Sequence, residues 1–338
     1  MKRKGRLLQS RGTVIINYFS SLFTFLFSLQ RITMDFNLTN CTVCPRKCGT
    51  DRTKSAGYCG ASDKIEVSKV MLHHWEEPCI SGFDEKRGSG AVFFTHCPLG
   101  CVYCQNRDIS RRSCTGTVYS IRELADIFLG LQRDGAYNIN LVSPTQYTPQ
   151  IIEAVKIARE DGLNLPVVWN TGGYELPETV EALAGTVDIF LTDFKYSSPE
   201  TAKLYSHAED YPETAAASLI KMYGLVGKCT FDDAGMMTRG VIVRHLILPG
   251  HRADSIAVLR KIAEILPVEN LRLSLMAQYT PEFLEEPSAA DVPDRYKKIR
   301  RRITSFEYQA VLDESERLGF DGWSQERTSA TKKYTPDF

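Results

Sequence analysis

Short apolar runs alternate with amphipathic segments along most of the chain. The apolar runs cover residues 91–95, 139–142, 166–169, 188–192, 241–248 and 271–275. The amphipathic segments lie near residues 120–133, 149–161, 177–184, 212–226 and 254–265. We interpret the runs as buried strands and the segments between them as helices. Ser120, followed by Glu123 three residues later, is a capping box that predicts the start of the first helix.

The order of these elements indicates the fold class. Strands that are nearly continuous in apolar residues, each followed by a helix, are typical of a parallel sheet covered on both faces. The six repeats predict an α/β fold with a partial (β/α)6 TIM-like barrel, and an open doubly wound sheet is the alternative. In both architectures, functional side chains gather at the carboxyl ends of the strands.

Residues 40–90 follow a different pattern. They are rich in cysteine, glycine and charge and show little periodicity, which we interpret as a loop-rich module tied by metal. We therefore expect four parts: a non-domain extension over residues 1–33, a Cys-rich N-terminal module over 34–90, a barrel core over 91–285, and a C-terminal helical segment and tail over 286–338.

The extension resembles a leader segment. Five basic residues precede an apolar stretch over residues 14–29, but no small-x-small cleavage site follows. The stretch is shorter than the ~20 residues that span a bilayer. Because Met34 lies just ahead of the first cysteine, we favour translation from Met34, or a non-functional extension, over export. A membrane anchor stays open.

Charge and cysteine usage narrow the function classes. Lys+Arg and Asp+Glu both count 41 among 338 residues, so no net field attracts nucleic acid or an anionic membrane. We interpret the basic run over residues 297–302 as a solvated helix face. Nine of the ten cysteines lie between Cys41 and Cys114. Clustered cysteines in a chain with a large core favour metal binding in a reducing compartment over a disulfide scaffold.

Three cysteines follow the first predicted strand of the core. Cys97, Cys101 and Cys104 have the spacing C-x3-C-x2-C, and Gly100 permits the tight loop that convergent thiolates need. Iron–sulfur clusters are held by cysteine thiolates, so three ligands leave one iron of a cubane open. A structural zinc knuckle or three unrelated thiols are the alternatives.

This triplet, with Tyr103 before the third cysteine, resembles the signature of the radical S-adenosylmethionine (SAM) superfamily. The resemblance implies that Cys97, Cys101 and Cys104 are catalytic ligands of a [4Fe–4S] cluster whose open iron chelates SAM. It also implies that one electron cleaves SAM to a 5′-deoxyadenosyl radical, which abstracts hydrogen from a substrate. Tyr103 is then expected beside the adenine.

Further segments resemble the pyruvate formate-lyase-activating-enzyme-like group of that superfamily. They lie at residues 76–82, 88–90, 93–94, 104–106, 142–147, 193–195 and 243–250, so the similarity covers about residues 41–279. The resemblance implies an oxidoreductase like the [formate-C-acetyltransferase]-activating enzyme. Its exact reaction is left open.

Polar residues at the strand ends are the candidates for SAM binding. Relatives often carry a Gly-Gly-Glu-like stretch after the second strand, where this chain has Ser143, Thr145 and Gln146. Asn170 ends the third strand and is a candidate for the carboxylate or the ribose. A simple turn is the alternative for these positions.

Two charged positions complete the candidate set. Asp193 and Lys195 resemble the Asp-x-Lys pair of the activases, and residues two apart on a strand point to the same face. Arg244 interrupts an apolar strand and therefore needs a partner. The partner is either the SAM carboxylate or a structural salt bridge.

Four upstream cysteines form a second candidate metal site. Cys41, Cys44, Cys48 and Cys59 have the spacing C-x2-C-x3-C-x10-C, which suits zinc or a second iron–sulfur cluster. Zinc is the favoured metal, because nothing in the spacing requires electron transfer. Unligated reduced thiols are the remaining alternative.

The sequence thus predicts a cytoplasmic radical SAM enzyme. Its expected partners are SAM, an electron donor such as flavodoxin or ferredoxin, and a substrate that is either a glycine of a partner protein or a smaller molecule. Neither nucleic acid nor a membrane is expected. A non-catalytic iron–sulfur or zinc scaffold or electron carrier is the alternative from another class. The ring of polar strand ends counts against it, since a carrier needs no such ring.

Overall fold

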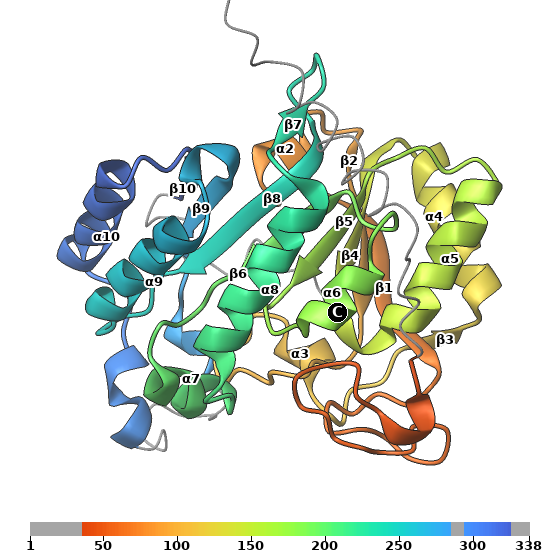
Figure 1. Ribbon diagram of the computed structural model, residues 1–338, viewed down its shortest axis with the longest axis horizontal. Helices are drawn as coiled ribbons and strands as arrows, with labels where there is room; N and C mark the ends of the chain where they lie inside the picture. The colour runs from red at the N-terminus through yellow and green to blue at the C-terminus, as the bar shows by residue number, and fades with distance from the viewer. Residues whose placement is uncertain (1–35, 285–293, 326–338) are drawn as a thin grey trace, which may run out of the picture. The chain divides into compact units, whose positions relative to one another are not determined.

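A computed structural model describes residues 36–284 and 294–325, and six parallel strands form its centre. In spatial order they are β2 (Gly88–Phe94), β4 (Ala136–Val142), β5 (Val167–Thr171), β6 (Ile189–Asp193), β8 (Met237–Leu246) and β9 (Arg272–Met276). Every neighbouring pair among them is parallel. The six apolar runs are confirmed as strands, and the sheet has the order expected of a partial barrel (Figure 1).

Further strands extend the sheet at its edges. β1 (Ile65–His73) pairs antiparallel with β2, and β3 (Thr117–Tyr119) pairs antiparallel with β1. At the other edge β10 (Gly322–Ser324) pairs parallel with β9, and β7 (Thr230–Phe231) pairs with β8. The sequence pattern did not predict β1, because Glu66, Ser68 and Lys69 interrupt its apolar residues and half of its positions are only partly buried. The expectation of a loop-rich module over residues 40–90 did not include this strand.

Helices pack along the outside of the sheet (Figure 1). They are α4 (Ile121–Arg133), α5 (Thr148–Glu160), α6 (Pro177–Ala182), α7 (Pro199–Ser206), α8 (Tyr211–Val226), α9 (Arg252–Ile265) and α10 (Ser305–Arg317). The five predicted helices are confirmed, and the capping box of Ser120 and Glu123 starts α4. The pattern did not predict α7, which is short and begins with Pro199 after the cap of Ser198.

One short helix fills the inside of the barrel. α2 (Pro78–Ser81) lies between β1 and β2 in the chain, and Cys79 and Ile80 pack against buried residues of β5, β6 and β8. These strand residues are Val168, Ile189, Leu191 and Ile242. Burying this apolar surface stabilises α2, which is too short to form alone. The interior of the sheet is therefore plugged by chain rather than open from end to end.

The remaining short elements are loops and single turns. α3 (Arg107–Ser110) follows the cysteine triplet, and five 3₁₀ turns cover Leu38–Asn40, Thr145–Tyr147, Val268–Asn270, Pro281–Phe283 and Asp294–Ile299. The loops that carry Cys41 to Cys59 lie near α3 in Figure 1. In the described ranges no helix has the length and apolar character needed to cross a bilayer. Residues 1–33, with the basic and apolar stretches discussed above, lie outside the described residues.

Candidate functional site

The cysteine triplet forms a loop at the carboxyl end of β2. His96 turns the chain with φ 70°, and Gly100 bends the loop with φ 62°. The amide of Cys104 donates to the carbonyl of Cys101 at 3.1 Å, which closes the second turn. The amide of Val102 donates to the carbonyl of Tyr205 at 2.9 Å and ties the loop to α7. All three cysteines line one cavity of about 450 Å³.

This cavity also receives most of the other candidate residues. Tyr103, Ser143, Asn170, Asp193, Lys195 and Arg244 line it together with the three cysteines. The predicted strands β4, β5, β6 and β8 deliver these side chains to one place, although the residues are spread over more than a hundred positions. The carboxyl ends of these strands therefore meet at one cavity, and the function of the residues there stays a prediction.

The cysteines of the triplet are buried or partly buried, and two of the three thiols have a polar partner. Burial raises the pKa of Cys97 to about 12, and the nearby thiols Cys101 and Cys104 add to this. Burial also raises the pKa of Cys101, although the charge of Lys195 opposes the rise. The hydroxyl of Ser206 donates to Cys101 Sγ at 2.9 Å, and that of Ser110 donates to Cys104 Sγ at 3.4 Å. Buried thiolates need a compensating positive group. Three cysteine sulfurs are suitable ligands for the irons of an iron–sulfur cluster, which would supply that charge.

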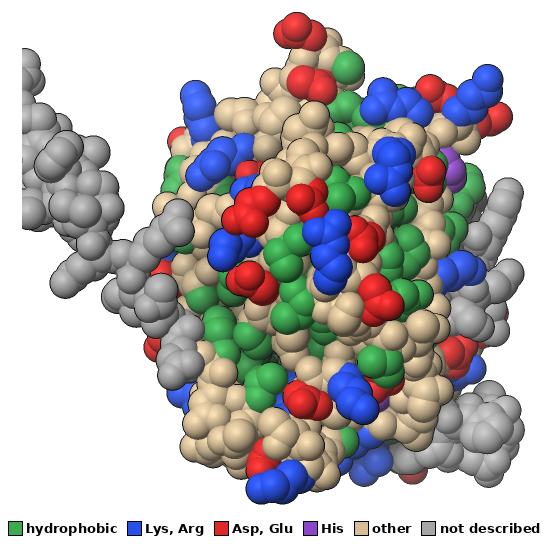
Figure 2. Space-filling view, turned by 90° about the vertical axis from the view of Figure 1, so that its right-hand side faces the viewer, with side chains coloured by type: hydrophobic (Ala, Val, Ile, Leu, Met, Phe, Trp, Pro, Cys, Tyr) green, Lys and Arg blue, Asp and Glu red, His purple; other side chains and the backbone are tan. Residues whose placement is uncertain are grey.

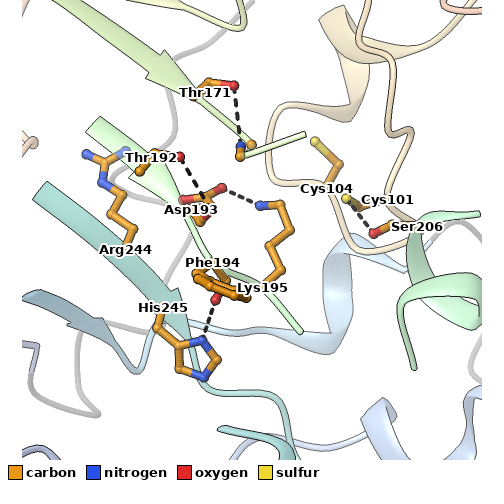
Figure 3. Close-up of polar contacts among 12 residues, drawn as sticks. Cys101, Cys104, Thr171, Thr192, Asp193, Phe194, Lys195, Ser206, Arg244 and His245 are labelled. Carbon is orange, nitrogen blue, oxygen red and sulfur yellow. Dashed lines mark hydrogen bonds and ion pairs between the residues drawn. The ribbon is translucent and has the colours of Figure 1, made fainter. Parts of the chain in front are cut away.

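Asp193 and Lys195 form an ion pair that faces the triplet. Lys195 Nζ donates to Asp193 Oδ2, and both side chains are mostly buried. Figure 3 shows Lys195 between Asp193 and the loop of Cys101 and Cys104. Burial alone would lower the pKa of Lys195, but the charges of Asp193 and Cys101 raise it well above its usual value. The ammonium group thus stays charged beside the thiols.

Arg244 belongs to a buried cluster of charges. Its Nε and Nη2 donate to the two carboxylate oxygens of Glu77 at 2.8 and 2.7 Å, and Nη2 also donates to Glu76. The side-chain amides of Asn140 and Asn170 donate to Glu76 Oε1 at 3.1 and 3.2 Å. Of the two partners that the sequence left open for Arg244, the geometry favours the structural salt bridge. Glu76 and Glu77 were missed as its partners, although the chain places them together just before Pro78.

Tyr103 lies in a group of aromatic residues. Its ring meets those of Tyr205 and Tyr279 edge-on at centroid distances of 6.3 and 5.9 Å, and its hydroxyl contacts that of Tyr196 at 2.5 Å. Burial raises the pKa of Tyr103 well above 10. The residue is therefore a neutral and fixed wall of the cavity, and its position beside adenine stays a prediction.

Thr145 and Gln146 do not lie in the cavity lining, and their contact with SAM stays a prediction. The hydroxyl of Thr145 donates to buried Glu175 at 2.6 Å. The amide nitrogen of Gln146 donates to the carbonyls of Thr95 and Ser143, each at 2.8 Å. Both side chains point away from the cavity, because buried backbone carbonyls and a buried carboxylate need hydrogen-bond donors. Gln146 thereby holds the ends of β2 and β4 together, and Thr145 is tied to Glu175 after β5.

The upstream cysteines approach one another in the loops before β1. Burial, followed by the nearby thiols Cys59 and Cys41, raises the pKa of Cys44 to about 12. Cys48 hydrogen-bonds with Cys41, and Arg52 Nη1 lies 3.8 Å from Cys41 Sγ. Across residues 36–284 and 294–325, no three Cys, His, Asp or Glu side chains converge as the ligands of a single ion do. Zinc or a second cluster at Cys41, Cys44, Cys48 and Cys59 stays a prediction.

Arg46 connects the upstream loop to the triplet loop, and sequence reasoning missed it. Its Nε donates to the carbonyl of Pro98 at 2.9 Å, and its Nη2 donates to the carbonyl of Ser206 at 3.0 Å. Its guanidinium lies over the rings of Tyr58 and Tyr174, at 4.7 and 5.1 Å from their centroids. An arginine between two cysteines carries no sequence signal for such a role, because its partners are backbone carbonyls distant in the chain.

Comparison with known proteins supports one family. The model of the radical SAM superfamily matches residues 91–232, which contain the triplet and Asp193 and Lys195. An uncharacterized protein of Methanocaldococcus jannaschii is 30% identical over 290 residues, which cover 83% of this chain and 76% of that protein. A solved radical SAM methyltransferase from Sphaerobacter thermophilus is similar over 72% of this chain and 67% of its own, with 15% identity and a TM-score of 0.45.

Proposed function

Because the chain belongs to the radical SAM superfamily, we propose that it is an enzyme that cleaves SAM reductively in the 450 Å³ cavity and abstracts hydrogen from a substrate. One observation carries the proposal. Three thiols with the spacing C-x3-C-x2-C line the same cavity as the buried pair of Asp193 and Lys195. A protein that only stores metal or carries electrons has no need for charged groups beside an open cavity.

The chain's own residues have separable roles in this proposal. Cys97, Cys101 and Cys104 hold the [4Fe–4S] cluster, and the hydroxyls of Ser206 and Ser110 donate to two of the sulfurs. Hydrogen bonds to cluster sulfurs raise the reduction potential, so these serines favour the reduced state. When bound and reduced, such a cluster would supply the one electron that breaks a carbon–sulfur bond of SAM, which releases methionine and a 5′-deoxyadenosyl radical.

The Asp193–Lys195 pair is suited to the two ends of an amino acid. Lys195 is charged and complements a carboxylate, and Asp193 complements an ammonium group. Tyr103 offers an aromatic wall to a purine. Their burial excludes water from the reacting atoms and strengthens each contact.

The proposal also extends to the class of substrate. Resemblance to the pyruvate formate-lyase-activating-enzyme-like group favours a glycine in a partner protein, converted to a glycyl radical. Trp75 and Trp323, from beyond β1 and from β10, both line the cavity at the two edges of the sheet. A peptide loop could approach between these edges. Modification of a smaller molecule in the same cavity is the alternative.

The test is formation of 5′-deoxyadenosine. The chain is reconstituted anaerobically with iron and sulfide, reduced with dithionite and given SAM. We expect product from the parent and from a Cys229→Ala control, since Cys229 lies outside the cavity lining. The Cys97→Ala, Cys101→Ala, Cys104→Ala variant should give none. A reducible cluster that never yields 5′-deoxyadenosine, with candidate peptides or without, would instead support an electron carrier.

A further inference from the structure

The Asp193–Lys195 pair lies where the sheet stops fixing the backbone. β6 ends at Asp193, whose ladder partner is Arg244, and Lys195 lies beyond the strand. Residues two apart point to the same face only while the chain keeps the pleat of a strand. The strand therefore orients Asp193 but not Lys195, although both side chains line the cavity. A different contact has to hold the two together.

The hydroxyl of Tyr211 lies at this point. Tyr211 is the first residue of α8 and is fully buried. Its oxygen accepts from the amide of Lys195 at 2.9 Å, and its proton is directed at the carbonyls of Gly172 and Asp193, at 2.9 and 3.1 Å. One hydroxyl thus bridges both ends of the segment that carries the pair and joins that segment to the end of β5.

The middle of the segment is held from the opposite side. The amide of Phe194 donates to the carbonyl of Arg244 at 2.8 Å, and the carbonyl of Phe194 contacts His245 Nδ1 at 2.7 Å (Figure 3). Both bonds come from β8 and fix residue 194. The bond that fixes the next amide, that of Lys195, comes from Tyr211.

The ring of Tyr211 is itself fixed. It stacks on Tyr174 with centroids 6.1 Å apart and meets Tyr196 edge-on at 5.4 Å. Burial raises the pKa of Tyr211, although the charge of Lys195 opposes the rise. The phenol therefore stays neutral, with one proton for the carbonyls and a lone pair for the amide.

A glycine permits the close approach of the two strand ends. A Cβ at Gly173 would collide with the carbonyl of Asp193 and would lie 3.0 Å from the hydroxyl of Tyr211. The φ of 78° at Gly173 also disfavours other residues. Ser218, on the same helix as Tyr211, donates to the carbonyl of Gly173 at 3.2 Å. α8 thus holds the ends of β5 and β6 through two side chains.

We propose that Tyr211 is a positioning residue of the SAM cavity, whose hydroxyl sets the orientation of Asp193 and Lys195 toward the amino-acid end of SAM. The inference rests on the proposed function, in which this pair receives the ammonium and carboxylate groups. Tyr211 is not among the described residues that line the cavity, so it acts through the pair rather than by touching the ligand. Without the hydroxyl, both charges remain but can turn away from the ligand.

The test compares Tyr211→Phe in two backgrounds. One is the parent, and the other is Asp193→Asn with Lys195→Met, which removes both charges together and leaves neither uncompensated. Phenylalanine keeps the stacked ring and removes only the hydroxyl. The control is Tyr223→Phe on the same helix, whose hydroxyl accepts from Asn270 at 2.8 Å outside the cavity lining. Thermal unfolding checks that each protein is folded.

SAM binding is measured by calorimetry on each reconstituted protein with its cluster oxidised, so that no SAM is cleaved. The face over α4 and α5 mixes acidic and basic side chains (Figure 2). Attraction of the charged ligand to that face is therefore weak, and about 0.1 M salt screens what remains. Deuterium exchange of peptides that span residues 193–195 is followed without SAM by mass spectrometry.

We expect Tyr211→Phe to weaken SAM binding about tenfold in the parent and by less than about twofold in the background without the pair. The amide of Lys195 should exchange about tenfold faster or more, because its acceptor is lost. Tyr223→Phe should change neither quantity. Equal weakening in both backgrounds, no weakening in the parent, or unchanged exchange overturns the positioning role.

The proposed function is judged separately, by 5′-deoxyadenosine formation after reduction. A parent that binds SAM but forms no product refutes the proposed cleavage and leaves the binding comparison to decide the role of Tyr211. A parent that forms product, with Tyr211→Phe binding SAM as tightly as the parent, refutes the role of Tyr211 alone. A parent that binds no SAM refutes both.

Discussion

At the scale of single residues, the buried charges around Arg244 have the clearest effect on the stability of the fold. Arg244 faces two carboxylates, Glu76 and Glu77, and all three side chains are at most 15% exposed. Burial would raise the pKa of Glu77, but the charge of Arg244 holds it below its usual value. Each charge in this cluster is tolerated because the others are present.

We therefore predict different effects of breaking and of removing the cluster. Arg244→Met leaves two carboxylates uncompensated and should lower the free energy of unfolding by about 3–5 kcal/mol. Arg244→Met combined with Glu76→Gln and Glu77→Gln should recover most of that loss. Urea unfolding of the three proteins measures both effects. A triple variant as unstable as the single one would contradict this account.

The same cluster shows what sequence reasoning can reach at this scale. Arg244 stood out because a charge in an apolar strand needs a partner. Its partner Glu76 lies 168 positions away in a segment without periodicity, so no local pattern could identify it. The triplet could be predicted because its three cysteines lie within eight residues. Spacing could not tell that Thr145 and Gln146 lie outside the cavity lining, because it does not show which side of a strand end faces the cavity.

At the scale of elements, the connection between the upstream loop and the triplet loop matters most. Arg46 donates to carbonyls of Pro98 in the triplet loop and Ser206 at the end of α7. A hydrogen bond from a charged donor contributes about 1.5–3 kcal/mol. Arg46 is thus a positioning residue for the triplet loop.

We predict that Arg46→Ala loosens this loop. Amides in residues 97–104 should exchange with deuterium about tenfold faster or more, as followed by mass spectrometry of the peptides. Arg159→Ala is the matched control, since Arg159 also donates to two backbone carbonyls, those of Gly185 and Thr186, far from the triplet in the chain. Equal exchange of residues 97–104 in the two variants would argue against a positioning role.

Elements could be predicted where their period was regular. The strands of the parallel sheet each contain a short run that is nearly continuous in apolar residues, so these six runs sufficed to predict them. β1 carries Glu66 and Lys69 on partly buried positions, and α7 spans only Pro199–Ser206, so neither gave a periodic signal. The position of α2 inside the barrel could not be foreseen, because Pro78–Ser81 is too short to reveal which surface covers it.

At the scale of the whole molecule, a partly buried acid couples stability to pH. Asp254 lies in the first turn of α9, and its Oδ1 accepts from the amides of Ser197 and Ser198 at 3.0 and 2.7 Å. Burial raises its pKa to about 6, although these two donors oppose the rise. The folded chain therefore binds this proton more tightly than the unfolded chain, in which the pKa is about 3.9. Its contribution to stability is present below about pH 4 and is lost as the pH rises to about 6.

We predict that Asp254→Asn removes this dependence. The asparagine keeps an oxygen for both amides but carries no charge, so the variant should exceed the parent by about 2 kcal/mol at pH 8. The two should be nearly equal at pH 4. Urea unfolding at both pH values measures the difference. A constant offset between the proteins at both pH values would rule out Asp254 as the source.

The plug formed by α2 has a consequence for the order of events. Cys79 and Ile80 pack against the strands of the barrel, and Glu77 and Pro78 at the start of α2 line the cavity, so this helix bounds the cavity on one side. In a cavity that is closed on one side, the molecule bound nearest the opening enters last and leaves first. Whatever binds deepest must arrive before its co-reactant and depart after it. We therefore expect an ordered sequence of binding and release for two molecules that meet in this cavity.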